Sequence, residues 1–166
     1  MNLPFHLEDL NIALQLTLGQ QFGLAFLLGS FAVATWSDLK HLSAQREFME
    51  IWLLFVLAML ALDIYHAYLG LASAPMVGIK WGLIAMLSLL AWRRIGLLFR
   101  LAPADVAALA AAASLLTPVL VVLFYLIGKL LALVMGRWLA RGRQTWPFMP
   151  VVSLATLAVL AFGWCW

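Results

Sequence analysis

The chain consists of apolar stretches long enough to cross a membrane, separated by short polar loops. A membrane-crossing helix needs about 20 apolar residues. Of the 166 residues, 66% are hydrophobic and only 10% are charged, whereas about a quarter of a soluble domain is charged. The sequence therefore predicts an all-α, polytopic membrane protein with about six transmembrane helices. The expected spans are approximately residues 18–36, 51–69, 76–92, 103–116, 119–136 and 147–166.

The fourth of these stretches is shorter than the others. Pro103 suits the first turn of a helix, where its missing N–H costs nothing, and the run ends before Thr117 and Pro118. At 1.5 Å per residue such a helix is about 20 Å long, against ~30 Å for the hydrocarbon core. We expect its N-terminus to be recessed below the membrane surface.

The basic residues predict the orientation of the spans. All loop cations fall after the first, third and fifth spans, and the opposite loops contain none. Positively charged loops stay in the cytoplasm, so the N-terminus is expected outside the cell membrane. The cations of the three basic loops are Lys40, Arg46, Arg93, Arg94, Arg100, Arg137, Arg141 and Arg143.

Several classes of site are not expected. Cys165 is the one cysteine, so neither a disulfide framework nor a cysteine zinc site can form within one chain. His6 and His41 have no companions at ligand spacing, and we expect no metal and no cofactor. No nucleic-acid motif occurs, and the expected surroundings are the lipid bilayer. Residues 1–16 suggest an amphipathic or loosely ordered lead-in without the basic region of a signal peptide.

Two acids, Asp38 and Asp105, lie at the same predicted face, at the end of the first span and the start of the fourth. An acid near hydrocarbon is costly and is a functional candidate by default. Two carboxylates held close can share one proton. One then takes a proton from water while the other polarises a carbonyl, which hydrolyses a peptide bond without a metal. The alternative is structural, because Asp is a preferred N-cap.

Three segments resemble the type 4 prepilin peptidases, most closely the archaeal preflagellin and prepilin peptidases. Residues 37–40 (S-D-L-K) resemble the first active-site segment of the family. Residues 104–118 resemble its G-x-G-D segment in the archaeal form, and residues 146–150 (W-P-F-M-P) its proline-rich approach to the last helix. The resemblance extends over residues 22–163 and agrees with six spans. The chain departs from the pattern where Ala102 replaces the first glycine and Pro103 follows it.

The resemblance implies a function and a location. Residues 1–166 would be a single membrane-embedded peptidase domain in the plasma membrane, with Asp38 and Asp105 as its catalytic aspartates. Its substrates would be pilin-like or archaellin precursors, from which it removes a short basic leader at the cytoplasmic face. The cysteine-rich insertion of many bacterial relatives is missing, which implies cleavage without methylation of the new N-terminus.

Glu47 and Glu50 are candidates for contacting the substrate. A basic leader would be repelled by the cations of the three loops unless acids near the site attract it. The competing interpretation is that both are ordinary acids at the start of a helix, where the helix dipole favours them.

Four further titratable residues lie inside spans. Asp63 and Lys80 fall at similar depth on neighbouring antiparallel spans, which favours an ion pair over a proton path through Asp63 and His66. Lys129 is expected to extend to the cytoplasmic surface, or to approach the aspartates. Two rival functions stay open. Ala102 and Pro103 favour an inactive peptidase-like scaffold of a pilus or archaellum system, and Asp63, Lys80 and Lys129 would suit a small transporter subunit.

Overall fold

The structure is a computed structural model that describes residues 14–41, 46–139 and 147–165. Within these ranges it contains six α-helices and no β-strand, which confirms the all-α prediction. The predicted lead-in, with His6, lies almost wholly outside the described residues, as do Arg141 and Arg143. The helices are α2 (Leu18–His41), α3 (Arg46–Tyr68), α4 (Ala74–Ala91), α5 (Pro103–Ser114), α6 (Pro118–Leu139) and α7 (Met149–Cys165).

Four of the helices are long and apolar enough to cross a membrane, namely α2, α3, α4 and α6. Together with the two shorter apolar helices α5 and α7 they make an all-α polytopic membrane protein. The predicted shortness of the fourth segment is confirmed, since α5 has 12 residues. The main difference lies in the first loop, because α2 continues past Trp36 to His41.

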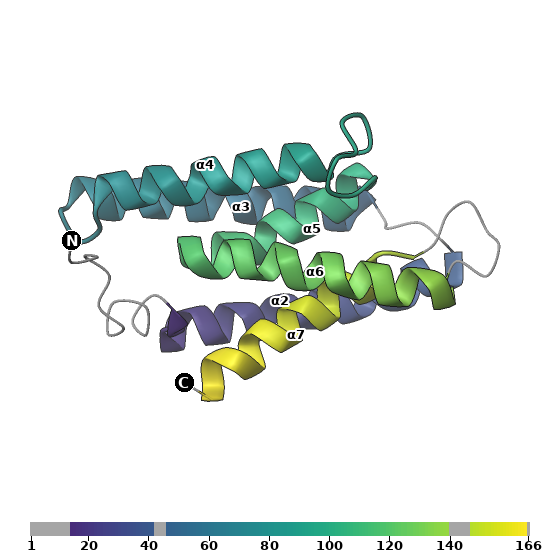
Figure 1. The fold of residues 1–166 in the computed structure, drawn as a ribbon. Coiled ribbons are helices and arrows are strands. Elements are labelled where there is room, and N and C mark those ends of the chain that lie inside the picture. The colour runs from purple at the N-terminus through teal and green to yellow at the C-terminus, as the bar shows by residue number, and fades with distance from the viewer. Residues whose placement is uncertain (1–13, 42–45, 140–146, 166) are drawn as a thin grey trace, which may run out of the picture.

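The helices run back and forth, so that the helix ends next to the three basic loops gather at one end of the bundle (Figure 1). The C-terminal ends of α2, α4 and α6 lie there beside the N-terminal ends of α3, α5 and α7. At the opposite end an uncharged turn joins α3 to α4. Gly70 closes this turn with a φ of 70°, a backbone conformation that only glycine adopts freely. We call the end that carries the cations the basic end.

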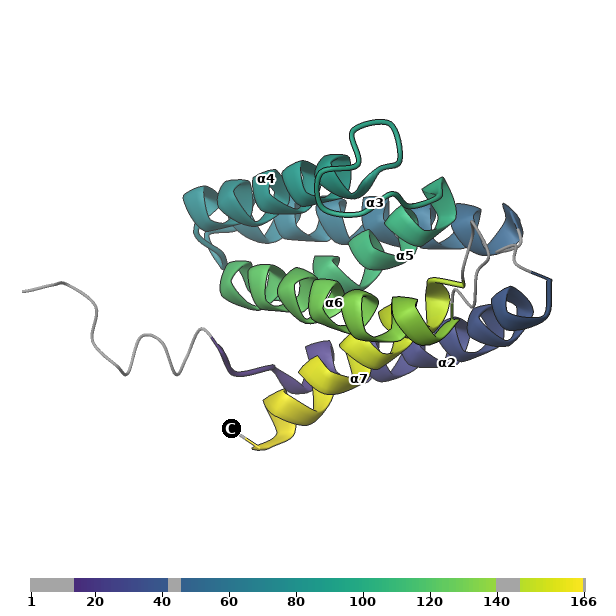
Figure 2. The same cartoon turned by 45° about the vertical axis from the view of Figure 1, so that its right-hand side comes forward.

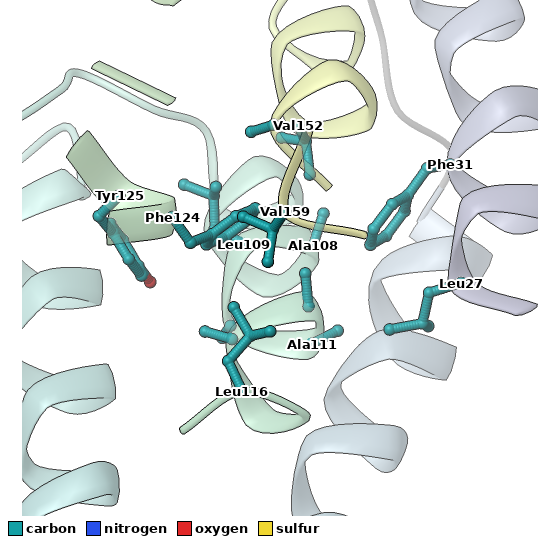
Figure 3. Close-up of a cluster of buried hydrophobic side chains, with 14 of the residues drawn as sticks. Leu27, Phe31, Ala108, Leu109, Ala111, Leu116, Phe124, Tyr125, Val152 and Val159 are labelled. Carbon is teal, nitrogen blue, oxygen red and sulfur yellow. The ribbon is translucent and has the colours of Figure 1, made fainter. Parts of the chain in front are cut away.

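The alanine-rich helix α5 lies at the centre of the bundle. Every residue from Ala107 to Ser114 is buried. The helix packs against α3 and α4 as well as α2, α6 and α7, and Figure 3 shows side chains of the last three next to it. Small side chains let neighbouring helices approach closely where no hydrophobic effect drives them together. Gly23 of α2 has the same effect, since a Cβ there would lie 2.9 Å from the Leu115 side chain. The run of alanines therefore serves as the surface on which the other helices pack.

Candidate active site at the basic end

Asp38 is buried at the basic end and lies against the start of another helix. Its side chain comes from the last turns of α2, and the residue is only 7% exposed. Its Oδ2 atom accepts a hydrogen bond of 3.1 Å from the backbone N–H of Met149, and the backbone of Phe148 also hydrogen-bonds it. Asp38 does not cap a helix in the first loop, because that segment is still part of α2.

Asp38 lies near the C-terminal end of α2, which is unfavourable for a carboxylate, and beside the N-terminal end of α7, which is favourable. A carboxylate near a helix C-terminus faces the negative end of the dipole of its own helix. The first N–H groups of a helix, by contrast, need acceptors and favour an anion. The residues at the start of α7, Phe148, Met149 and Pro150, carry no side-chain oxygen. Asp38 therefore supplies the N-terminal acceptor that the sequence around α7 lacks.

Asp105 lies in the first turn of α5. The N-cap is Ala102, which has no side-chain hydrogen bond, so the expectation that Asp105 is itself the N-cap is wrong. Its carboxylate instead accepts a hydrogen bond from the backbone of Ala102. This is one half of a capping box, in which an acid in the first turn reaches back to the N-cap.

The two aspartates come together although 66 residues separate them in the chain. The negative charge of Asp38 acts directly on Asp105, and the helices α2, α5 and α7 contact one another pairwise. Two carboxylates in each other's field cannot both ionise at low cost, which favours the state in which one of them keeps its proton. The arrangement can thus hold an ionised and a protonated acid side by side.

An aromatic contact connects the segments that hold the two acids. Phe99, which precedes Asp105, meets the ring of Phe148 edge-on with the ring centroids 5.4 Å apart. Phe148 is one of the residues whose backbone bonds Asp38. The loop before α5 and the segment before α7 are therefore packed on each other. This contact holds the segment before Asp105 against the segment that bonds Asp38.

Lys129 of α6 supports the same loop. Its ammonium group donates a hydrogen bond to the carbonyl oxygen of Leu98 and lies 5.2 Å from the centroid of the Phe99 ring. The ammonium group thus contacts the loop at the basic end, and the extension of Lys129 to the cytoplasmic surface stays a prediction. In the described part of the chain it forms no ion pair with either aspartate. Lys129 therefore contacts the segment that precedes Asp105, through Leu98 and Phe99.

Glu47 and Glu50 lie exposed at the start of α3, at the basic end. Glu47 occupies the first turn of that helix, where an acid is favoured by the helix dipole. This supports the structural interpretation for Glu47, and a substrate contact stays a prediction for both residues.

Among the described residues, the start of α5 is exposed next to Asp105. Ala107 to Ser114 of α5 are buried within the bundle. Ala102 and Pro103 are exposed, and Asp105 is partly exposed. An extended peptide can therefore approach Asp105 from the basic end, past the Ala102–Pro103 edge.

The sequence analysis did not identify Phe148 and Met149 as part of the site. Their backbone N–H groups hydrogen-bond the Asp38 carboxylate. One signal pointed to them: α7 begins without a Ser, Thr, Asp or Asn, although most helix starts carry one. A helix start without its own acceptor predicts an acceptor from elsewhere in the chain. Nothing in the sequence shows that Asp38 provides it.

A second charged cluster, remote from the basic end, joins α3 to α4. The Lys80 ammonium donates to Asp63 Oδ2 at 2.7 Å, and the Trp81 indole N–H donates to the same oxygen at 2.9 Å. The predicted ion pair is confirmed. The side chains are 12% and 19% exposed for Lys80 and Asp63, so neither charge could be left alone cheaply.

Breaking this ion pair is expected to destabilise the α3–α4 hairpin. Lys80→Met leaves the Asp63 carboxylate unneutralised, which costs about 3–5 kcal/mol for a buried pair. The double variant Asp63→Leu/Lys80→Met removes both charges and is expected to recover most of that loss. Unfolding of the purified protein in detergent micelles measures both. Equal stability of wild type and Lys80→Met would contradict a structural role for the pair.

The fold and the paired acids define the class of the molecule as a polytopic helical membrane protein with two interacting aspartates at one end. Comparisons with models of protein families, with curated proteins and with solved structures found no match to this chain. A functional assignment therefore rests on the site itself.

Proposed function

We propose that the chain is a membrane aspartyl endopeptidase of the plasma membrane that removes the short leader of pilin-like or archaellin precursors at the cytoplasmic face. The observation that carries this proposal is the convergence of Asp38 and Asp105, close enough for one charge to act on the other. Both acids are held by backbone N–H groups on helices. The positive-inside rule assigns the basic end, and with it the two acids, to the cytoplasm.

The reaction needs only the two carboxyl groups and a water molecule. The ionised aspartate takes a proton from water as the water oxygen bonds to the scissile carbonyl carbon. The protonated aspartate gives its proton to the carbonyl oxygen. When the resulting tetrahedral centre collapses, the C–N bond breaks and the amine nitrogen takes up a proton from the pair. The coupled acids titrate as a unit, and each serves once as donor and once as acceptor.

The rival function that the structure favours most is a catalytically inactive scaffold. Asp38 already has a structural role, since it accepts hydrogen bonds at the start of α7. Pro103 and Ala102 also make the loop before Asp105 less adaptable than the family's glycine. The transporter rival is weakened, because Asp63 and Lys80 neutralise each other.

A processing assay tests the proposal. The full chain is expressed together with a pilin-like precursor that carries a short basic leader ahead of an apolar helix. We expect the precursor to be shortened at one site, detected by the mass of the product and by its new N-terminus. A precursor that stays intact with the wild-type chain, at expression levels confirmed in the membrane fraction, would refute the peptidase and favour the scaffold.

A further inference from the structure

The loop between α4 and α5 projects sideways from the basic end. We call residues 92–101 the arginine loop, because Arg93, Arg94 and Arg100 lie in it. In Figures 1 and 2 the loop rises from the end of α4, away from α6 and α7. It therefore extends outward from the flank of the bundle, and not along the helix axes.

Backbone hydrogen bonds give the arginine loop a fixed shape. The N–H of Arg93 donates to the carbonyl of Leu101 at 3.1 Å, and the N–H of Gly96 donates to the carbonyl of Trp92 at 2.8 Å. A bridge also pairs Trp92 with Leu101. Gly96 has a φ of 61°, which lets the chain turn back at the tip. The loop is thus a built element that holds its side chains in place.

The loop has two chemically different sides. Phe99 and Leu101 face inward and are only 7% and 5% exposed. Leu97 and Ile95 point outward and are 76% and 48% exposed, and all three arginines are exposed as well. Its outer side therefore presents cations and large apolar side chains together.

The positive charges of the loop are not neutralised within the described part of the chain. None of the three guanidinium groups forms an ion pair there. Arg94 lies over the Trp92 ring, 5.3 Å from its centroid. The Arg100 side chain folds back against the tip, where its Cγ would lie 3.0 Å from a Cβ at Gly96. Three cations on one short loop without a counterion favour an anionic partner.

The depth of the loop indicates which anion it meets. Because α4 is long and apolar enough to span the bilayer, Trp92 directly after it falls at the membrane surface, where tryptophan is enriched. Guanidinium groups bind phosphate bidentately. Burial of the exposed Leu97 side chain among acyl chains would be favourable, because its apolar surface would be removed from water. An acidic protein segment would offer the arginines an anion but would give Leu97 no apolar surroundings. We propose that the arginine loop binds the phosphate groups of anionic lipids and inserts Ile95 and Leu97 among their acyl chains.

This proposal is independent of the peptidase and is tested by the position of Leu97. In the full chain with Cys165→Ser, Leu97→Cys carries a fluorescent label in proteoliposomes whose lipids have brominated acyl chains. Quenching is expected to be stronger when part of the phosphatidylcholine is replaced by phosphatidylglycerol. With Arg94→Gln, the fraction of phosphatidylglycerol that gives half of the increase in quenching should be about fivefold higher. Arg93→Gln/Arg94→Gln/Arg100→Gln should abolish it.

The matched control is Leu71→Cys. Leu71 is 73% exposed in the turn between α3 and α4, which carries no cation, so its quenching should be equal in both kinds of vesicle. Equal quenching at position 97 with and without phosphatidylglycerol would overturn the proposal. So would reversal of the effect by soluble glycerol phosphate, which would indicate a free phosphate site. A change at position 97 caused only by a polyglutamate peptide would assign the loop to a protein partner.

Discussion

Asp105→Asn is expected to abolish cleavage of a pilin-like precursor while the protein keeps its fold. The amide oxygen of asparagine can still accept the hydrogen bond from Ala102, and its volume is nearly the same. It cannot take up and release a proton, so the rate is expected to fall by about 10²–10⁴-fold, the usual contribution of a general acid or base. The rate of leader removal in proteoliposomes measures the loss, and an unfolding curve of the same preparation measures the stability.

Two outcomes distinguish chemistry from structure at this position. Asp105→Ala removes both the acid and the hydrogen bond at the start of α5, so it should be inactive and also less stable by about 0.5–1.5 kcal/mol. If Asp105→Asn processes the precursor at the wild-type rate, the shared-proton mechanism is wrong. If both variants are stable and wild type itself is inactive, the acid serves neither chemistry nor capping.

The helices were predictable because most of the apolar runs begin or end at a charged segment or at a proline. The predicted starts at Leu18 and Pro103 are confirmed, and the ion pair between Asp63 and Lys80 followed from their depth on neighbouring spans. The capping box at the start of α2 was readable but was missed: Thr17 and Gln20 bond each other's backbone N–H groups reciprocally, as this pattern predicts.

From the sequence, it could be predicted only that the two acids lie at the same face of the membrane, and not that they lie close together. Their common face followed from the alternation of the basic loops, which is a property of the sequence. Their proximity depends on Phe99 packing against Phe148 and on the α7 helix start bonding Asp38. The first contact joins residues that are 49 positions apart in the chain, and the second joins residues that are 111 positions apart. No local sequence pattern encodes such contacts. The predicted end of α2 was too early for a similar reason. An acid in the last turns of a helix is unfavourable beside the negative end of the helix dipole, but hydrogen bonds from the start of α7 stabilise Asp38 there.

Replacing Asp38 is expected to separate its two roles, because it is both a candidate catalytic acid and the acceptor at the start of α7. Asp38→Asn keeps an oxygen for the Met149 N–H, so most of the stability should remain while cleavage falls by about 10²–10⁴-fold. Asp38→Ala leaves that buried N–H without its acceptor and should cost a further 1–3 kcal/mol, approximately. Cleavage rates and unfolding curves of the two variants, measured in the same micelles, give both numbers.

The same pair of variants decides between the peptidase and the inactive scaffold. A scaffold needs Asp38 only as a hydrogen-bond acceptor, so Asp38→Asn would support pilus or archaellum assembly as well as wild type and only Asp38→Ala would fail. A peptidase needs the proton, so Asp38→Asn would fail as completely as Asp105→Asn although it remains folded. The two acids must also behave as a unit: the double variant Asp38→Asn/Asp105→Asn should be no slower than either single one. A further loss in the double variant would mean that the two carboxylates act separately, and the shared proton would have to be abandoned.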